Sequence, residues 1–108
     1  MDPQFGVEVE HRDDTTEVRL RGELDLVTRE AAWEQLEPVL DARSVVLDIR
    51  NVSFMDSTGI NLIARAAQTL ADASRVLTIR ARVDQQALRV LKVANLGDLF
   101  TLEVDEAS

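Results

Sequence analysis

Four consecutive residues, Asp56-Ser57-Thr58-Gly59, are the part of this sequence best equipped for chemistry. They follow a largely apolar run at 45–49 and precede residues with helical spacing, so they are expected at a strand-to-helix corner. The simplest interpretation is a helix N-cap, in which a side-chain oxygen accepts from a free backbone N–H and contributes ~1 kcal/mol. The other interpretations are a nucleophilic serine and a site that another enzyme modifies.

A nucleophilic serine needs a base within hydrogen-bond reach. The only histidine, His11, falls at the end of the first expected strand, and the neighbouring Asp56 is a weak base at neutral pH. The G-x-S-x-G elbow of serine hydrolases is missing, because the corner reads Met-Asp-Ser-Thr-Gly. We therefore predict that the chain is not an enzyme.

Metal and cofactor sites have equally little support. Asp48 and Asp56 could approach each other, but no cluster of histidine or cysteine accompanies them, and EF-hand spacing is absent. The glycines are scattered singly, so the sequence has neither a Walker A loop nor a G-x-G-x-x-G turn. We expect no metal and no cofactor.

Modification of Ser57 has the clearest mechanism. A helix N-terminus favours negative charge, so a phosphate there would leave the domain folded. It would add about −1.5 to −2 charges beside Asp56. A partner docked on the corner would lose complementarity, and a loss of ~3 kcal/mol weakens binding roughly a hundredfold. Gly59 would let another group approach closely, and Met55 is expected to be exposed.

Composition limits the setting and the partners. The 108 residues fit one domain, and a hydrophobic content of 45% supports a core without disulfides. The chain has no cysteine, no secretory leader and no apolar run near the roughly 18 residues of a membrane span, which favours the cytoplasm. With 20 acidic and 12 basic residues the net charge is −8, which disfavours nucleic acid and anionic membranes as partners. Most charges are expected in solvated surface pairs.

Two half-buried strands open the chain. Residues 7–11 and 17–21 alternate apolar and polar side chains, and 13–16 between them form a turn cluster, so a hairpin is predicted with Gly22 ending its second strand. Further strands are predicted at 44–49, 76–79 and 100–104.

Three stretches have helical spacing. The first follows Thr28 as its N-cap and contains Pro38, which would kink or shorten it. The second follows the corner and breaks at 72–74, and the third starts at Asp84 as N-cap and stops at 95–97. Their inner faces consist of Ala32, Trp33, Leu36, Val39 and Leu40, of Ile60, Ile63, Ala64, Ala67 and Leu70, and of Ala87, Val90, Leu91 and Ala94.

The order of elements is therefore β-β-α-β-α-β-α-β. Strand-helix-strand units imply parallel pairing with right-handed crossovers, and the first hairpin adds an antiparallel part. The predicted fold is one α/β domain over 1–108 with a mixed sheet of about four to five strands, a core near 7–104 and tails at 1–6 and 105–108. Ser57 would lie at the carboxyl edge of the sheet, where open α/β sheets bind ligands, and Glu23 and Asp25 could reach that edge.

The sequence resembles a STAS domain, and in particular the stand-alone bacterial anti-sigma factor antagonists. The resemblance covers about 7–104. Leu96 and Phe100 also fit the family's closing helix-loop-strand. Its most specific motifs are Gly22-Glu23-Leu24-Asp25, then Thr28, then Val46-Leu47-Asp48-Ile49, and then Val52-Ser53-Phe54-Met55-Asp56-Ser57-Thr58-Gly59-Ile60.

The resemblance implies a partner-switching regulator without catalysis of its own. Such proteins bind an anti-sigma factor that is a serine kinase, and this binding frees a sigma factor for transcription. The kinase phosphorylates the serine after the aspartate, here Ser57, and the complex dissociates until a serine phosphatase restores the protein. Thr58 stands where many relatives have serine and could be a second acceptor.

The resemblance and the sheet geometry together give a set of expected partner contacts. Asp25 could instead only cap the turn before the first helix, and Trp33 is expected in the core or as half-buried helix surface. Asn61 is polar where many relatives have a small or apolar residue, which could alter partner choice. The full set is Glu23, Asp25, Thr28, Asp56, Ser57, Thr58, Gly59 and Asn61.

Two other functions stay open at this point. The chain could be a STAS subunit of a larger assembly, such as a lipid-transport ATPase complex or a stress-sensing scaffold, in which Ser57 need not be phosphorylated. It could also bind a nucleotide, as proposed for some relatives, although no phosphate loop is visible. In every case a monomer or weak dimer is expected.

Overall fold

The computed structural model describes residues 5–41, 43–96 and 98–106. Within these residues, five strands form one sheet in the order β1-β2-β3-β4-β5. β1 pairs antiparallel with β2, and each later pair of neighbours is parallel. The predicted order of elements and the mixed sheet are confirmed. The strands are β1 (Gly6–His11), β2 (Thr15–Leu24), β3 (Ser44–Met55), β4 (Leu77–Arg82) and β5 (Thr101–Asp105).

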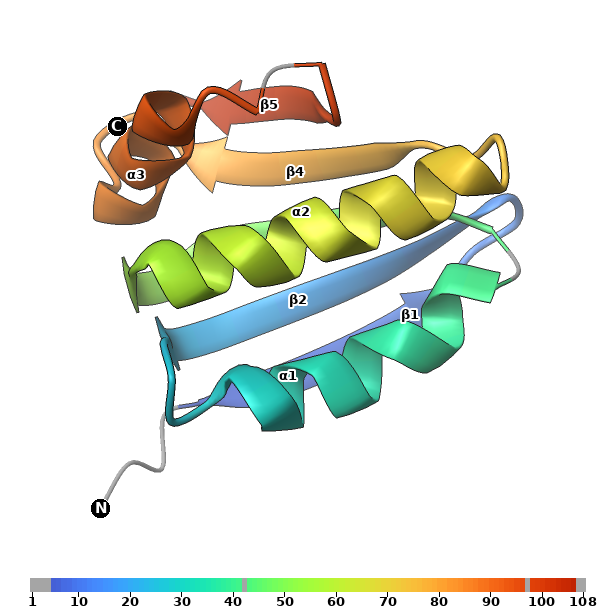
Figure 1. Ribbon diagram of the computed structural model, residues 1–108, viewed down its shortest axis with the longest axis horizontal. Helices are drawn as coiled ribbons and strands as arrows, with labels where there is room; N and C mark the ends of the chain where they lie inside the picture. Colours follow the sequence, from blue (N-terminus) through green and yellow to red (C-terminus); the bar gives the residue numbers. More distant parts are fainter. Residues whose placement is uncertain (1–4, 42, 97, 107–108) are drawn as a thin grey trace.

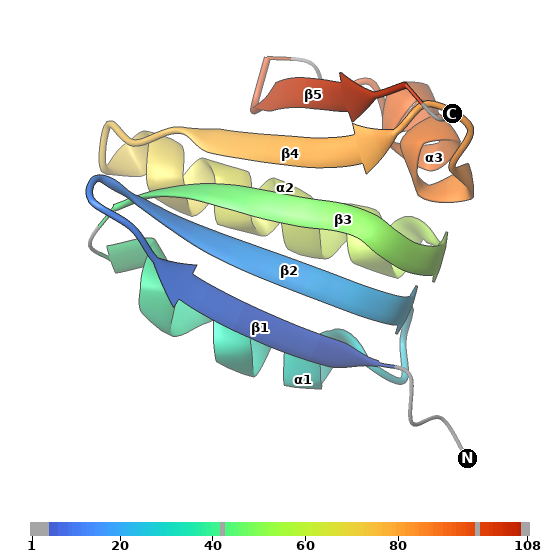
Figure 2. The same cartoon turned by 180° about the vertical axis from the view of Figure 1, so that it is seen from behind.

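The helices lie on one side of the sheet (Figures 1 and 2). α1 (Arg29–Leu36) and α2 (Ser57–Asp72) run along the strands, whereas α3 (Gln86–Ala94) stands near the carboxyl end of β4. A 3-10 turn, Glu37–Asp41, follows α1 directly, so the proline at 38 shortens the α-helix as expected. None of the helices in the described ranges has the length and apolar character needed to cross a membrane.

The core lies between the sheet and the helices. Along β3, Val45, Leu47 and Ile49 are fully buried because alternate side chains of a strand point to the same face. Ile63 and Leu70 of α2 are fully buried in the same cluster. The intervening β3 side chains point to the opposite face, which Figure 2 shows uncovered by helices.

Several strand boundaries differ from the prediction. β2 starts at Thr15, inside the predicted turn, β4 extends to Arg82, and β5 ends at Asp105. β2 does not end at Gly22 but continues to Leu24. Gly22 has a φ of 93°, next to a register shift against β3, and glycine tolerates this conformation while the strand goes on. β3 runs past residue 49 to Met55, so Met55 is fully buried and the expectation that it is exposed is wrong.

The start of α3 also differs from the prediction. Asp84 was expected to cap this helix, but the N-cap residue is Gln85 and the Asp84 side chain is exposed. Gln85 is buried, and its side-chain amide forms hydrogen bonds with the backbone of β3 and β4, as described below. The predicted stop is confirmed at Asn95, which adopts a left-handed conformation with a φ of 58°, while Gly97 lies outside the described residues.

Candidate functional site

Two loops meet at the carboxyl edge of the sheet. β2 and β3 are parallel neighbours, and their last paired residues are Leu24 and Met55. The residues that follow, Asp25 and Asp56, therefore leave the sheet side by side. The register thus brings the Gly-Glu-Leu-Asp motif and the serine corner together.

The first loop is a closed turn held by Asp25 and Thr28. The Asp25 carboxylate accepts from the backbone N–H groups of Val27 and Thr28 at 3.0 and 3.2 Å. The Thr28 hydroxyl donates to the carbonyl of Glu23 at 2.7 Å and accepts from the N–H of Asp25 at 3.1 Å. Thr28 occupies the N-cap position of α1 but its side chain does not cap the helix, contrary to the prediction. Asp25 does cap the turn, and its carboxylate remains half-buried at the edge.

The second loop presents Ser57. Asp56 is the N-cap of α2, and its carboxylate accepts from the N–H groups of Thr58 and Gly59 at 2.9 and 3.4 Å. One acid therefore does the capping, and the adjacent hydroxyls are not needed for it. Ser57 is exposed, and its hydroxyl has no hydrogen-bond partner among the described residues.

Gly59 allows a close approach, but from inside the protein. A Cβ at this position would lie 2.6 Å from Cγ of Met55 and 3.2 Å from two side-chain carbons of Leu24. The first turn of α2 therefore presses directly on the ends of β2 and β3. This contact sets the position of Ser57 relative to the ends of β2 and β3.

Two glutamines support the corner from behind, and sequence analysis missed both. β3 pairs with β4 only from Val45 to Asp48, so the rest of that edge needs other partners. The Gln85 amide donates to the carbonyls of Ile49 and Val52 and accepts from the N–H of Arg82. The Gln86 amide bonds both the N–H and the carbonyl of Met55, each at 2.9 Å. The sequence signal for this pair is two adjacent glutamines at the start of a helix. Each side-chain amide can both donate to a backbone carbonyl and accept from a backbone N–H of a nearby strand.

The turn between β2 and α1 also carries two exposed apolar side chains. Leu26 is 68% exposed and Val27 is 87% exposed, directly beside Asp25. The predicted contact residues were almost all polar and omitted this pair. The sequence signal that was missed is that Leu26 and Val27 fit neither the alternation of the preceding strand nor the apolar stripe of the following helix, which is typical of exposed apolar residues in a loop.

The predicted contact residues differ in accessibility. Glu23, Ser57 and Asn61 are exposed, whereas Asp25, Asp56 and Thr58 are half-buried. Thr28 and Gly59 are buried, so they can shape the site but offer little surface. Among the described residues of this edge, the exposed Ser57 hydroxyl thus lies close to the carboxylates of Asp25 and Asp56 without bonding to either.

The residues considered for other chemistry lie elsewhere. His11 is paired with Thr16 in the sheet register, and its ring nitrogen lies 3.0 Å from the Thr16 hydroxyl. Eight residues of β2 separate Thr16 from the corner, or about 26 Å of extended strand, so His11 does not contact Ser57. In the described ranges, no cluster of three metal-ligating side chains is present.

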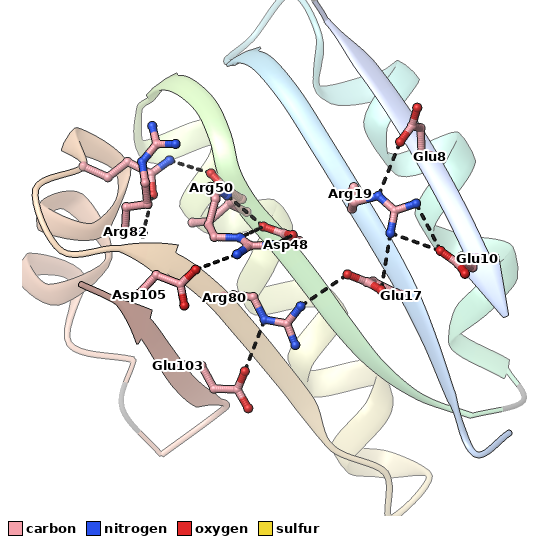
Figure 3. A network of polar contacts seen from close by, with 12 residues as sticks. Glu8, Glu10, Glu17, Arg19, Asp48, Arg50, Arg80, Arg82, Glu103 and Asp105 are labelled. Atoms are coloured by element: carbon pink, nitrogen blue, oxygen red, sulfur yellow. Dashed lines mark hydrogen bonds and ion pairs between the residues drawn. The ribbon is translucent and has the colours of Figure 1, made fainter. Parts of the chain in front are cut away.

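Asp48 belongs to the open face rather than to the corner. Its carboxylate pairs with the guanidinium of Arg50 at 2.7 Å, and Arg50 also reaches Asp105 of β5 (Figure 3). Burial acts to raise the pKa of Asp48, but hydrogen bonds from Arg50 outweigh it and hold this pKa below its ordinary value. The pKa of Arg50 is raised in turn, first by its bond to Asp48 and then by Asp105. Asp48 therefore has a structural role.

Comparison with known proteins places this geometry in a family. A family model described as "Mlab, STAS domain" matches residues 7–103. The anti-sigma-B factor antagonist of Staphylococcus aureus (strain NCTC 8325 / PS 47) is 32% identical over 98 residues, covering 89% of this chain and 90% of the relative. The protein of the same name from Staphylococcus epidermidis is 33% identical with the same coverage.

Solved structures agree. An anti-sigma factor antagonist from Mycobacterium paratuberculosis has a TM-score of 0.83 at 25% identity, covering 92% of this chain and 85% of that one. Unphosphorylated SpoIIAA, described as an anti-sigma factor antagonist, has a TM-score of 0.68 at 20% identity, covering 95% and 90%, and supports the fold alone. The fold is thus that of a STAS domain. The chain belongs to the STAS domain family, and within it to the anti-sigma factor antagonists.

Proposed function

We propose that this protein is a cytoplasmic anti-sigma factor antagonist controlled by phosphorylation of Ser57. In its unphosphorylated form it binds an anti-sigma factor that is also a serine kinase, and the sigma factor held by that kinase is released. The observation that supports this most directly is the exposed, unpartnered hydroxyl of Ser57 at a helix start that Asp56 already caps.

The chemistry is carried out by the partner. The kinase transfers the γ-phosphoryl group of ATP to Oγ of Ser57, so the bond between that phosphorus and ADP breaks and a new O–P bond forms. The hydroxyl proton passes to a base of the kinase, and ADP leaves. A serine phosphatase later hydrolyses the O–P bond with water and returns the free hydroxyl and inorganic phosphate.

Release follows from charge. The corner already carries Glu23, Asp25 and Asp56, so a complementary partner surface must be basic. A phosphate adds about −1.5 to −2 charges and three oxygens in the space that the partner occupies. The helix start tolerates that charge, because the N-terminal end of α2 is positive, so the domain stays folded while the complex dissociates.

The other site residues have supporting roles in this proposal. Asp25 and Thr28 hold the neighbouring turn, Asp56 and Gly59 set the position of Ser57, and Asn61 lies one turn further along α2. Thr58 is half-buried, which makes it the poorer of the two acceptors.

A second candidate uses the same corner without phosphorylation. The matching family model is described by the name Mlab, so the chain could instead be a constant docking subunit of a larger assembly such as a transport ATPase. In that case Ser57 would be a contact residue and would remain unmodified.

Intact mass separates the two candidates. The parent, Ser57→Ala and Thr58→Val proteins would be incubated with magnesium-ATP and a lysate of the organism that encodes the chain, then mapped by peptide mass spectrometry. The proposal predicts one added phosphate on the parent and on Thr58→Val, and none on Ser57→Ala. An unmodified parent, in a lysate whose kinases are active on other substrates, would favour the assembly subunit.

A further inference from the structure

A groove between α1 and α2 begins beside the serine corner and has no role in the account so far. Its volume is about 270 Å³. α1 contributes Arg29, Glu30 and Trp33 to its walls, and the first turns of α2 contribute Thr58 and Asn61. Leu62 and Arg65 complete the lining.

Arg19, Arg50 and Arg80 form ion pairs with carboxylates on the open face of the sheet, whereas other arginines of the described fold, Arg75, Arg82 and Arg89 among them, form no ion pair. The two arginines of this groove belong to the second group. Among the described residues, neither Arg29 nor Arg65 forms an ion pair, and Glu30 is paired with neither of them. The groove therefore keeps positive charge available in a chain with a net charge of −8.

Arg29 stands where a cation is unfavourable. It is the first residue of α1, and the N-terminal end of a helix is positive, so an arginine there costs stability instead of adding to it. Glu30 in the same first turn interacts favourably with this end of the helix, but in the described fold it forms no ion pair with Arg29.

Arg65 of α2 stacks on the Trp33 ring of α1. Its guanidinium carbon lies 4.2 Å from the centre of the Trp33 ring, which fixes the plane of the guanidinium by a cation–π contact. The N–H groups at the rim of a stacked guanidinium can still bind a carboxylate in a forked geometry. The half-buried Trp33 offers apolar surface next to it, and the buried Leu62 also lines the groove.

We propose that this groove is the second half of the docking surface and receives a carboxylate side chain of the anti-sigma factor. An apolar neighbour of that carboxylate packs on Trp33. The inference rests on the proposed function, because the groove adjoins Ser57 through Thr58 and Asn61. Basic groups of the partner meet the acidic corner while an acidic group meets the groove, and this fixes the orientation of the complex.

Charge reversal in the groove gives the test. The variants are Arg29→Glu, Arg65→Glu and their combination, with Arg89→Glu on the exposed face of α3 as the matched control. The readout is kcat/KM for Ser57 phosphorylation by the kinase fraction purified from lysate for that activity. Each groove variant should lower it at least about tenfold, and Arg89→Glu should leave it unchanged.

Two further measurements separate docking from folding. Arg29→Glu places an acid at the helix start, so its melting temperature should stay equal to that of the parent or rise while its phosphorylation slows. Trp33 is the only tryptophan in the chain, so a 5-fluorotryptophan label gives one fluorine NMR signal within the groove. Adding the kinase fraction should shift or broaden this signal in the parent and not in the combined variant.

The outcomes distinguish this inference from the proposed function. Phosphorylation of the groove variants at the parent rate, with an unchanged fluorine signal, would overturn the groove and leave the function intact. Equal slowing by Arg89→Glu would show a general charge effect and would also overturn it. A parent that no lysate kinase modifies would contradict the proposed function, and the groove would lose its partner with it.

Discussion

The two faces of the sheet use charge in opposite ways. On the open face, ion pairs link all five strands: Arg19 joins β2 to glutamates of β1, Arg80 reaches both Glu17 and Glu103, and Arg50 reaches Asp48 and Asp105 (Figure 3). On the helix side, the acids of the serine corner and the arginines of the groove beside it form no ion pairs among the described residues, and the Ser57 hydroxyl forms no hydrogen bond there. We expect the charges that are paired on the open face to contribute to stability, and the unpaired charges near Ser57 to contribute to binding a partner. Variants on the open face should therefore change stability, and variants around Ser57 should change binding.

The largest effect on stability is expected behind the corner, at Gln85. Replacement by leucine keeps similar bulk but leaves the carbonyls of Ile49 and Val52 and the N–H of Arg82 without their partner. Gln85→Leu should lower the free energy of unfolding by about 3 kcal/mol, measured by urea denaturation. Gln35→Leu, on the exposed face of α1, is the control. Equal stability of the two variants would mean that the amide does not hold the edge of β3.

Ser57→Glu should have the largest effect on binding. It should weaken the complex with the anti-sigma factor roughly a hundredfold, because a charge enters a surface built for a neutral hydroxyl, while the melting temperature stays the same. Isothermal titration calorimetry measures the first quantity and thermal denaturation the second. Thr101→Glu, at an exposed position of β5, should bind like the parent. Parent-like binding by Ser57→Glu would remove electrostatic switching from the account.

Asp48→Asn tests the buried end of the open-face network. The change should cost about 2 kcal/mol at neutral pH, because the bonds from Arg50 lose their charge. The pKa of Asp48 is lower in the folded than in the unfolded state. Its contribution is therefore complete above the unfolded value near about 4 and disappears as the pH falls through the folded value.

The gap in stability between the parent and Asp48→Asn should thus narrow below about pH 4. Urea denaturation across that range measures the gap, with Asp13→Asn in the exposed first turn as the control. Affinity for the anti-sigma factor should be unchanged. A gap that stays constant into acid would show that the Asp48 carboxylate is not the group responsible.

The smallest effect is expected at Arg19, in the exposed part of the same network. Its guanidinium contacts three glutamates at 3.2–3.3 Å, and these bonds raise its pKa, but the surrounding water screens them. Arg19→Ala should lower the melting temperature by less than about 3 °C, and added salt should reduce the difference further. If Arg19→Ala destabilised the protein as much as Asp48→Asn does, the stabilisation would come from the whole network of ion pairs and not mainly from the buried Asp48.

The sequence allowed most of the architecture to be predicted, because the hydrophobic spacing of the strands and helices is regular. The inward stripe of Ala67 and Leu70 matches the helical period, and the apolar run at 45–49 indicated a central strand, so the order of elements and the parallel pairing followed. Ends of elements were harder. β2 passes Gly22 because glycine can adopt its φ of 93° without leaving the sheet, and no local pattern distinguishes this from a turn.

The candidate site was predictable only where a single stretch of sequence carries it. Asp56, Ser57 and the turn at Asp25 stand in compact motifs, and the β2–β3 register brings them together. The support from Gln85 and the groove around Arg65 and Trp33 join elements far apart in the chain. Their roles depend on which backbone edge or ring lies opposite, and only the folded structure gives that information.

The central claim is that phosphorylation of Ser57 weakens binding to the partner and leaves the fold intact. The most direct test prepares the protein in both forms, unphosphorylated and enzymatically phosphorylated at Ser57, and titrates each into the purified anti-sigma kinase. The account predicts roughly a hundredfold weaker affinity for the phosphorylated form, with the same melting temperature for both. Equal affinities of the two forms would contradict it.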